Sequence, residues 1–70
     1  MPVKILLREI RDARNVSLND LARLTGLSPQ YLSKIENGKS NPTLKTIGDI
    51  CQGLQIQPGD WIVYEFKNND

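Results

Sequence analysis

The sequence lacks histidine and contains a single cysteine among its 70 residues. Cys51 alone cannot form an internal disulfide, and a zinc site without histidine is implausible. The sequence also lacks a close carboxylate pair and a glycine loop that could cradle phosphates, two common features of enzyme sites. We therefore expect no metal, no other cofactor and no enzymatic activity. Cys51 falls within an apolar helical pattern, so we expect it to pack in the core as an unreactive thiol.

Long apolar runs are also missing. No stretch approaches the length of about 20 residues that crosses a bilayer, and the N-terminus shows no cleavable signal pattern. We expect a cytoplasmic protein with no membrane contact, and no pattern indicates a small-molecule ligand. The length predicts a single domain over 1–70 with a small core, which favours regular helix packing and self-association as sources of stability.

Positive and negative charges nearly balance, with a net charge of +1, but they are unevenly distributed. Residues 1–45 carry eight Lys or Arg and four Asp or Glu, whereas residues 46–70 carry one Lys and four Asp or Glu. A basic front and an acidic back suit a domain that lays one face on phosphates. Ordinary scatter in a small protein gives the same imbalance, so this observation alone leaves both interpretations open.

Apolar spacing and capping residues predict four short helices, over 6–14, 18–25, 29–37 and 44 to about 54. Ser17, Ser28 and Thr43 can cap the last three, and Gly26 can end the second in a left-handed conformation. Close helix approach would explain the glycines at positions 48 and 53. The inward-facing residues are expected to be Leu6, Ile10 and Ala13 in the first helix, with Leu7 beside them, Leu18, Leu21 and Ala22 in the second, Leu32 and Ile35 in the third, and Leu44, Ile47, Ile50, Cys51 and Leu54 in the fourth.

The two ends of the chain have a different character. Residues 57–60 predict a turn or a short fifth helical turn, and the β-branched and aromatic segment 62–66 predicts a strand. Residues 3–5 could pair with it in an antiparallel ribbon. Because a two-stranded ribbon alone is only marginally stable, it should pack on the helices, on a second subunit or on both.

The stretch 18–37 carries the clearest functional signal. Its two helices are joined by a three-residue turn that begins at Gly26, with the small residue Ala22 where the helices would cross. This arrangement is the helix-turn-helix pattern. The second helix of such a pair can enter the major groove of DNA with its N-terminal half facing the base edges.

The match extends beyond these two helices, to about 7–54. Its strongest element is the run 32–39, Leu-Ser-Lys-Ile-Glu-Asn-Gly-Lys, followed by Asn41-Pro42. Together with 17–22 and 25–28, this run resembles the Cro/phage-repressor (Xre-like) family, and the ends are similar to the short cytolysin-operon repressors. The resemblance implies a mainly α-helical, five-helix lambda-repressor-like domain with a small two-stranded antiparallel ribbon. It also implies a transcriptional repressor that binds a palindromic operator in double-stranded DNA as a homodimer.

The resemblance places four residues against the bases: Pro29, Gln30, Ser33 and Lys34. Their chemistry agrees, since glutamine can bond adenine bidentately, lysine can donate to guanine, and serine can donate or accept. Without the motif, the same residues would be read as an ordinary solvated face. The expected phosphate contacts are Ser28, Tyr31, Asn37, Lys39, Ser40, Asn41 and Lys45, with Arg14 as a further candidate.

Two further positions follow from the resemblance. Some phage repressors carry a phosphate-binding glutamine at the start of the second helix, where this chain has Leu18, so that contact is absent here. Arg11 and Glu36 are implied to form a partly buried ion pair between the first and third helices. We expect this pair to be structural, because removing one partner would leave a buried charge uncompensated.

One reading helix meets two or three bases, which gives roughly 2–9 kcal/mol of discrimination, whereas genomic specificity commonly needs about 4–10 kcal/mol. A dimer on half-sites about 10–10.5 base pairs apart would double the contacts. Three of the four aromatic residues, Trp61, Tyr64 and Phe66, fall within the C-terminal segment 58–67. We predict that they form the dimer interface, the alternative being that they cover the core of their own subunit.

Two other functions compete with this interpretation. An antitoxin-like or protein-interaction module would bind a partner protein as well as DNA, although residues 67–70 form too short a tail to wrap around a partner. RNA recognition usually needs bases stacked on exposed aromatic side chains. Tyr31 is the one aromatic residue on the predicted reading face, which disfavours RNA.

Overall fold

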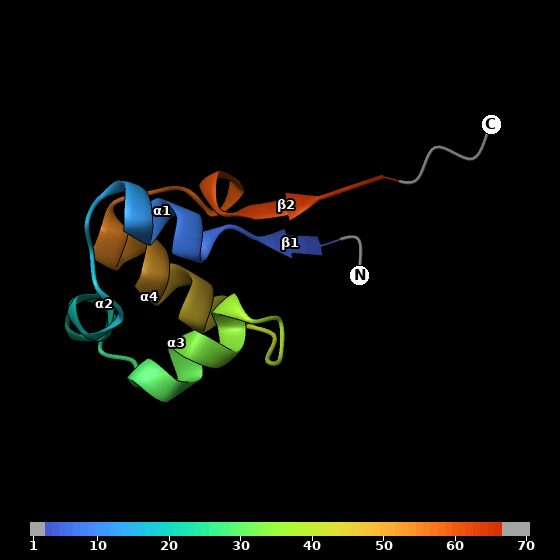
Figure 1. Cartoon of the computed structure of the whole chain (residues 1–70). Coiled ribbons are helices and arrows are strands. Elements are labelled where there is room, and N and C mark those ends of the chain that lie inside the picture. The colour runs from blue at the N-terminus through green and yellow to red at the C-terminus, as the bar shows by residue number, and fades with distance from the viewer. Residues whose placement is uncertain (1–2, 67–70) are drawn as a thin grey trace.

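The computed structural model describes residues 3–66. Within them the chain forms β1 (Val3–Ile5), α1 (Leu7–Ala13), α2 (Leu18–Thr25), α3 (Pro29–Glu36), α4 (Leu44–Leu54), the 3-10 turn η1 (Pro58–Asp60) and β2 (Ile62–Tyr64) (Figure 1). The four predicted helices and both strands are confirmed, and β2 ends two residues earlier than expected.

The five-helix count is wrong for the described part of the chain, which has four α-helices and a single 3-10 turn. The turn begins at Pro58 and closes with a hydrogen bond from Trp61 N to the Pro58 carbonyl oxygen, 3.2 Å away. The Trp61 carbonyl oxygen then accepts from Leu6 N at 2.7 Å. The chain thus passes from this single turn through Trp61 directly into β2.

The predicted caps set the helix starts. Ser17 Oγ accepts from Asp20 N at 3.0 Å while the Asp20 carboxylate accepts from Ser17 N, which completes a capping box at α2. Ser28 and Thr43 accept in the same way from the backbone N–H three residues on, at the starts of α3 and α4. Gly26 ends α2 at a φ of 76°, a left-handed conformation that glycine adopts without steric cost.

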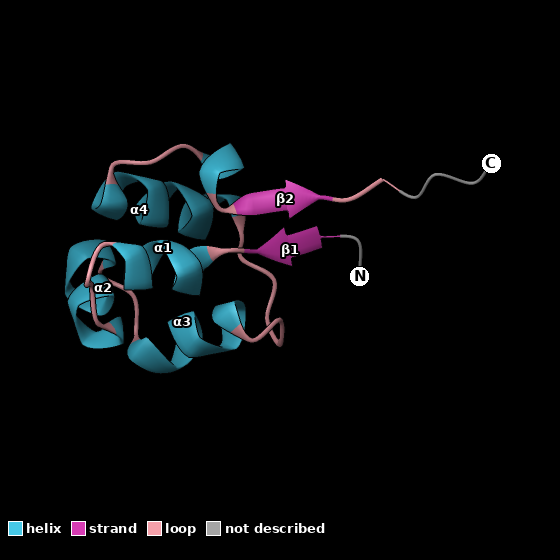
Figure 2. Cartoon of the chain, turned by 45° about the horizontal axis from the view of Figure 1, so that its top comes forward, coloured by secondary structure: helices cyan, strands magenta, loops and turns pink. Residues whose placement is uncertain are grey.

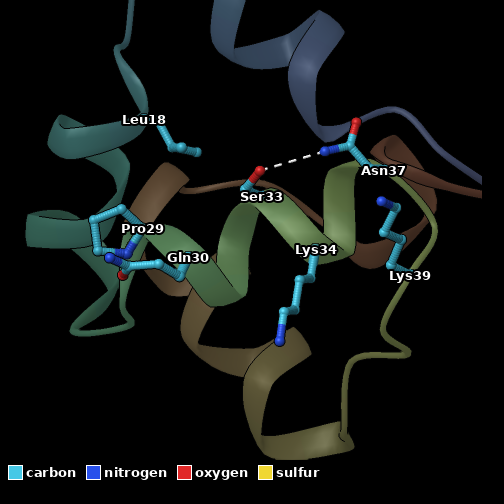
Figure 3. A pocket seen from close by; sticks show the side chains of 7 residues that line it. All are labelled: Leu18, Pro29, Gln30, Ser33, Lys34, Asn37 and Lys39. Carbon is cyan, nitrogen blue, oxygen red and sulfur yellow. Dashed lines mark hydrogen bonds between the residues drawn. The ribbon is translucent and has the colours of Figure 1, made fainter.

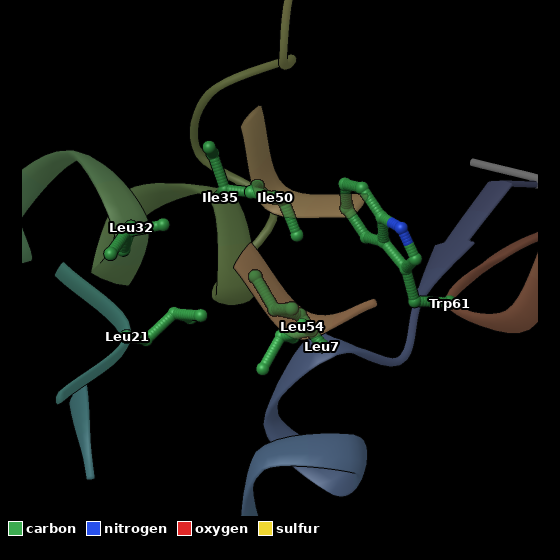
Figure 4. Close-up of a cluster of buried hydrophobic side chains, with 7 residues drawn as sticks. All are labelled: Leu7, Leu21, Leu32, Ile35, Ile50, Leu54 and Trp61. Carbon is green, nitrogen blue, oxygen red and sulfur yellow. The ribbon is translucent and has the colours of Figure 1, made fainter. Parts of the chain in front are cut away.

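The core consists of seven apolar side chains drawn from every helix and from the segment before β2 (Figure 4). These residues are Leu7, Leu21, Leu32, Ile35, Ile50, Leu54 and Trp61, none more than 4% exposed. Most were expected from the helical periodicity. Burying them removes the apolar surface from water, which is the main source of stability for a domain of this kind.

The periodicity misplaced three core positions. In α1 the buried residue is Leu7; Leu6 is only half-buried and Ala13 is exposed. Leu6 lies before the helix and is held by its backbone hydrogen bond, so the first helical residue takes the central position. In α4 the first helical residue, Leu44, is 87% exposed, whereas Thr46, two residues on, is buried.

Helices α2 and α4 approach closely at Gly53. A Cβ on this residue would lie 2.9 Å from the Leu24 carbonyl oxygen and 3.0 Å from Thr25 Cγ2, closer than a side chain tolerates. The prediction of a close approach is therefore confirmed for Gly53. It is wrong for Gly48, where a Cβ would meet nothing within 4 Å.

The elements leave α3 on one side of the helical body and η1 on the other, as both overall views show (Figures 1 and 2). The ribbon extends away from the helices and pairs Val3 with Tyr64 and Ile5 with Ile62. No helix in the described residues is long and apolar enough to span a membrane. On the side of α3 away from the core, Gln30, Lys34 and Asn37 are exposed.

Candidate nucleic-acid interface

Helix α3 buries one face and exposes the other. Leu32 and Ile35 are fully buried and fix the rotation of the helix against the core. Because 3.6 residues make a turn, positions spaced by three or four on the opposite side share a face. That face, with the loop that follows it, presents Pro29, Gln30, Ser33, Lys34, Asn37 and Lys39, which line a shallow depression together with Leu18 of α2 (Figure 3).

All four residues expected to meet bases therefore lie on one surface. Gln30 and Lys34 are exposed, and Pro29 and Ser33 are half-buried at its floor. Leu18 lines the same depression with an apolar side chain. The surface thus combines amide, hydroxyl and ammonium groups with apolar edges, a mixture that can bond base edges and contact a thymine methyl group.

The lysines of this surface are free to attract an anion. Within residues 3–66, neither Lys34 nor Lys39 forms an ion pair. Lys45, also expected to contact phosphate, is instead paired with Asp49 at 3.0 Å, one turn along α4. This pair is exposed, so it contributes little to stability and its lysine can exchange partners at little cost.

The other expected phosphate contacts have roles within the fold. Ser28 Oγ accepts from Tyr31 N at 3.1 Å as the cap of α3. The Tyr31 hydroxyl lies 3.2 Å from Thr46 Oγ1 and joins α3 to α4. Ser40 and Asn41 line a different hollow, between the loop after α3 and strand β1. Ser28, Tyr31, Ser40 and Asn41 therefore do not line the depression on α3.

Arg11 and Glu36 are in direct contact. Arg11 Nε and Nη2 donate to the two Glu36 carboxylate oxygens at 2.7 and 3.1 Å, and Arg11 Nη1 donates to the Val16 carbonyl oxygen at 3.1 Å. The Glu36 side chain is 2% exposed and that of Arg11 is 12% exposed. The hydrogen bond to Glu36 raises the pKa of Arg11 above its ordinary value. The pair fixes α1 against the end of α3.

Sequence reasoning missed Arg8 as part of this site. Its Nη2 donates to Asn37 Oδ1 at 2.9 Å, and its Nε lies 3.5 Å from Glu36 Oε1. Arg8 stands three residues before Arg11 on α1, which places both on one helical face. That spacing was the available signal. The hydrogen bond to Asn37 links α1 to the exposed face of α3.

The aromatic residues near the C-terminus divide into two groups. Trp61 is fully buried, with its indole Nε1 donating to Cys51 Sγ at 3.4 Å, so the prediction that it forms a dimer interface is wrong. Its side chain is enclosed by its own subunit and offers no surface to another. Tyr64 and Phe66 are 55% and 87% exposed, and their rings stack edge-on with centroids 4.8 Å apart.

The sequence matches curated transcriptional regulators over most of its length. It is 44% identical over 54 residues to the HTH-type transcriptional regulator DdrOP3 of Deinococcus deserti, covering 77% of this chain and 42% of that protein. It is 37% identical over 60 residues to the HTH-type transcriptional repressor RghR of Bacillus subtilis, covering 84% of this chain and 44% of RghR. The chain therefore spans less than half the length of these two relatives.

Solved structures of similar sequence share the fold. The restriction-modification controller protein C.AhdI of Aeromonas hydrophila superposes with a TM-score of 0.71 at 38% identity, covering 74% of this chain and 79% of that one. An HTH_3 family transcriptional regulator of Vibrio cholerae gives 0.72 at 40% identity, covering 76% and 30%. The family model HTH_3, helix-turn-helix, matches residues 7–61. The chain therefore belongs to the HTH_3 helix-turn-helix family of DNA-binding transcriptional regulators, the Xre/Cro-like class.

Proposed function

We propose that this protein is a sequence-specific repressor that binds a palindromic operator in double-stranded DNA as a homodimer. The observation that carries the proposal is the exposed face of α3, where Gln30, Ser33 and Lys34 line one shallow depression (Figure 3). Lys39 lines it too and forms no ion pair within residues 3–66. A helix that presents such groups along one open flank can lie in the major groove, where each base pair shows a distinct pattern of donors and acceptors. The repressor role rests on the likeness to RghR.

Selection of bound sequences from a random duplex pool tests this proposal. The expected result is one motif with two inverted half-sites whose centres lie about 10–10.5 base pairs apart, or a multiple of that spacing. A pool that shows no sequence preference would contradict sequence-specific reading, and a motif without inversion symmetry would contradict the dimer. Placing the selected duplex across a promoter in a purified transcription reaction then tests repression, and a rise in transcript would contradict it.

Base-reading and phosphate-binding residues should respond differently to substitution. Gln30→Ala or Lys34→Ala is expected to relax the preference at one position of each half-site, at a cost of about 1–3 kcal/mol for the preferred base. Lys39→Ala should weaken binding to all sequences alike and reduce the slope of log affinity against log salt by about one for each subunit. Titrations of labelled duplexes at several salt concentrations measure both effects. An unchanged sequence preference in both α3 variants would contradict the assignment.

The outer part of the ribbon is the surface that we assign to the second subunit. Val3 and Tyr64 are paired across the ribbon and so lie on the same face, and Phe66 stacks on Tyr64. The three side chains are 40%, 55% and 87% exposed, and this apolar strip belongs to the part of the ribbon that extends away from the helices (Figure 2). Aromatic residues are enriched at the centres of protein interfaces, where they contribute most of the binding energy.

Tyr64→Ala is accordingly expected to weaken dimerisation by at least about tenfold, because tyrosine is enriched among the interface residues whose truncation costs about 2 kcal/mol or more. Sedimentation equilibrium of the parent and the variant measures the dissociation constant. Leu24→Ala is the matched control, since Leu24 is also apolar and 53% exposed but lies on α2. Equal dissociation constants for the parent and Tyr64→Ala would exclude this ribbon surface.

A further inference from the structure

Two consecutive hydrogen bonds connect Arg8 of α1, through Asn37, to Ser33 on the exposed face of α3. Arg8 Nη2 donates to Asn37 Oδ1 at 2.9 Å, and Asn37 Nδ2 donates to Ser33 Oγ at 3.3 Å, the bond that Figure 3 marks. Arg8 is itself held near Glu36, with its Nε 3.5 Å from Glu36 Oε1. A residue of the first helix is thereby connected to a residue that we assign to base reading.

The guanidinium group of Arg8 determines the orientation of the Asn37 side-chain amide. A guanidinium group has only donors, so the atom of Asn37 that faces it must be the amide oxygen. The NH₂ group of Asn37 then faces Ser33. Without Arg8, the amide could turn over, because its oxygen and nitrogen have nearly the same size and shape.

The orientation of Asn37 decides what Ser33 can offer to DNA. An amide NH₂ cannot accept a hydrogen bond, so Asn37 occupies a lone pair of the Ser33 hydroxyl and leaves the proton unused. Serines in helices often donate the hydroxyl proton to the backbone carbonyl one turn earlier, which for Ser33 is the carbonyl of Pro29. No such bond to Pro29 is present in the described residues. In the described part of the chain, Asn37 is the one hydrogen-bond partner of the Ser33 side chain. The proton is therefore available to the groove.

We infer that Arg8 is a positioning residue for base recognition: by fixing the Asn37 amide it keeps Ser33 a donor toward DNA. Ser33 would then read a hydrogen-bond acceptor on a base edge. In the major groove, guanine and thymine present acceptors without a donor, cytosine presents a donor, and adenine presents both. The expected signature is a preference for guanine or thymine over cytosine at the position that Ser33 meets. This inference rests on the proposed function.

A simpler role for Arg8 is a direct phosphate contact, since its side chain is 53% exposed. The two roles give different results. A phosphate contact contributes about one unit to the salt slope and nothing to base preference, whereas a positioning residue changes the preference at one position and leaves the slope unchanged.

The test repeats the duplex selection with four variants. Ser33→Ala identifies the position in each half-site that Ser33 reads. In Asn37→Asp both side-chain oxygens accept, so one still accepts from Arg8 while the other takes the Ser33 proton. Only lone pairs of Ser33 then face the groove, and the ratio of guanine or thymine to cytosine at that position should fall about tenfold. Arg8→Ala should lower the same ratio about 2- to 10-fold, and Arg8→Lys, whose head group also has only donors, should preserve it.

Arg23→Ala is the matched control, because Arg23 is an exposed arginine that pairs with Asp20 on α2, away from Ser33 and Asn37. It should leave the ratio unchanged. Thermal unfolding of each variant establishes that it is folded. If Asn37→Asp fails to fold, the inference is tested by Arg8→Ala and Arg8→Lys alone, the first of which should lower the base ratio and the second preserve it.

Three results would overturn the inference: Ser33→Ala alters no position, Asn37→Asp leaves the ratio unchanged, or Arg8→Ala lowers the salt slope by about one without changing the ratio. Failure of the proposed function itself is distinguishable, because the parent protein would then select no motif at all.

Discussion

Replacing Arg11 with methionine is expected to lower the free energy of unfolding by about 3 kcal/mol. The substitution leaves the Glu36 carboxylate, only 2% exposed, without the two hydrogen bonds that Arg11 donates to it. Arg8 stays within 3.5 Å of Glu36 and keeps the loss at the lower end of the range of about 3–5 kcal/mol for a broken buried pair. A domain of this length has roughly 4–10 kcal/mol of stability in all, so urea denaturation will resolve the change clearly.

Two comparisons separate this effect from a general loss of charge. Lys45→Met breaks the exposed pair with Asp49 and should cost no more than about 0.5 kcal/mol. The double variant Arg11→Met with Glu36→Leu should recover most of the loss, because it removes the stranded charge along with its partner. If Arg11→Met costs no more than Lys45→Met, the pair does not fasten α1 to α3.

Truncating Trp61 is the second large effect. Trp61→Ala is expected to cost about 3–5 kcal/mol, the range for removing a large aromatic side chain from a core. Trp61 is fully buried between α4 and the ribbon end, and its carbonyl oxygen accepts from Leu6 N. Trp61 is the one tryptophan of the sequence, so the variant has no tryptophan fluorescence and its unfolding must be followed by circular dichroism.

This expectation differs from that of an interface residue. Loss of an interface aromatic would give a folded protein with a weaker dimer, whereas loss of Trp61 should give a protein that unfolds at much lower denaturant concentration at every protein concentration. Leu44→Ala, at a residue 87% exposed, is the control and should change the unfolding free energy by less than about 0.5 kcal/mol. A Trp61→Ala variant that is as stable as Leu44→Ala and monomeric where the parent is dimeric would show that Trp61 acts between subunits.

Local signals made much of the fold predictable from sequence. Ser17, Ser28 and Thr43 each satisfy a backbone donor within three residues, so their capping role can be read without tertiary contacts. Gly26 likewise marks its turn through its own backbone freedom. The outward side of α3 followed from the same locality, because Leu32 and Ile35 fix which side of the helix is turned inward. The assignment of base contact to residues on that side came from the family resemblance, because periodicity alone does not separate such a face from an ordinary solvated one.

Features that depend on how distant segments dock were not predictable. The sequence does not distinguish among the three aromatic residues near the C-terminus. The docking of the ribbon on the helices buries Trp61 and leaves Tyr64 and Phe66 exposed. Leu44 fits the apolar stripe of α4 but lies beyond the end of the core. The contact between Arg8 and Asn37 joins residues 29 positions apart. The spacing of Arg8 and Arg11 places both on one face of α1, but it does not identify Asn37 as the partner.

The central claim is that the polar face of α3 lies against the bases. Nuclear magnetic resonance of the isotope-labelled protein bound to its selected duplex tests it most directly. If α3 lies in the major groove, Gln30, Ser33 and Lys34 will show intermolecular Overhauser contacts to major-groove protons of the bases. Contacts concentrated instead on the ribbon or on η1, with these three side chains unchanged from the free protein, would contradict it.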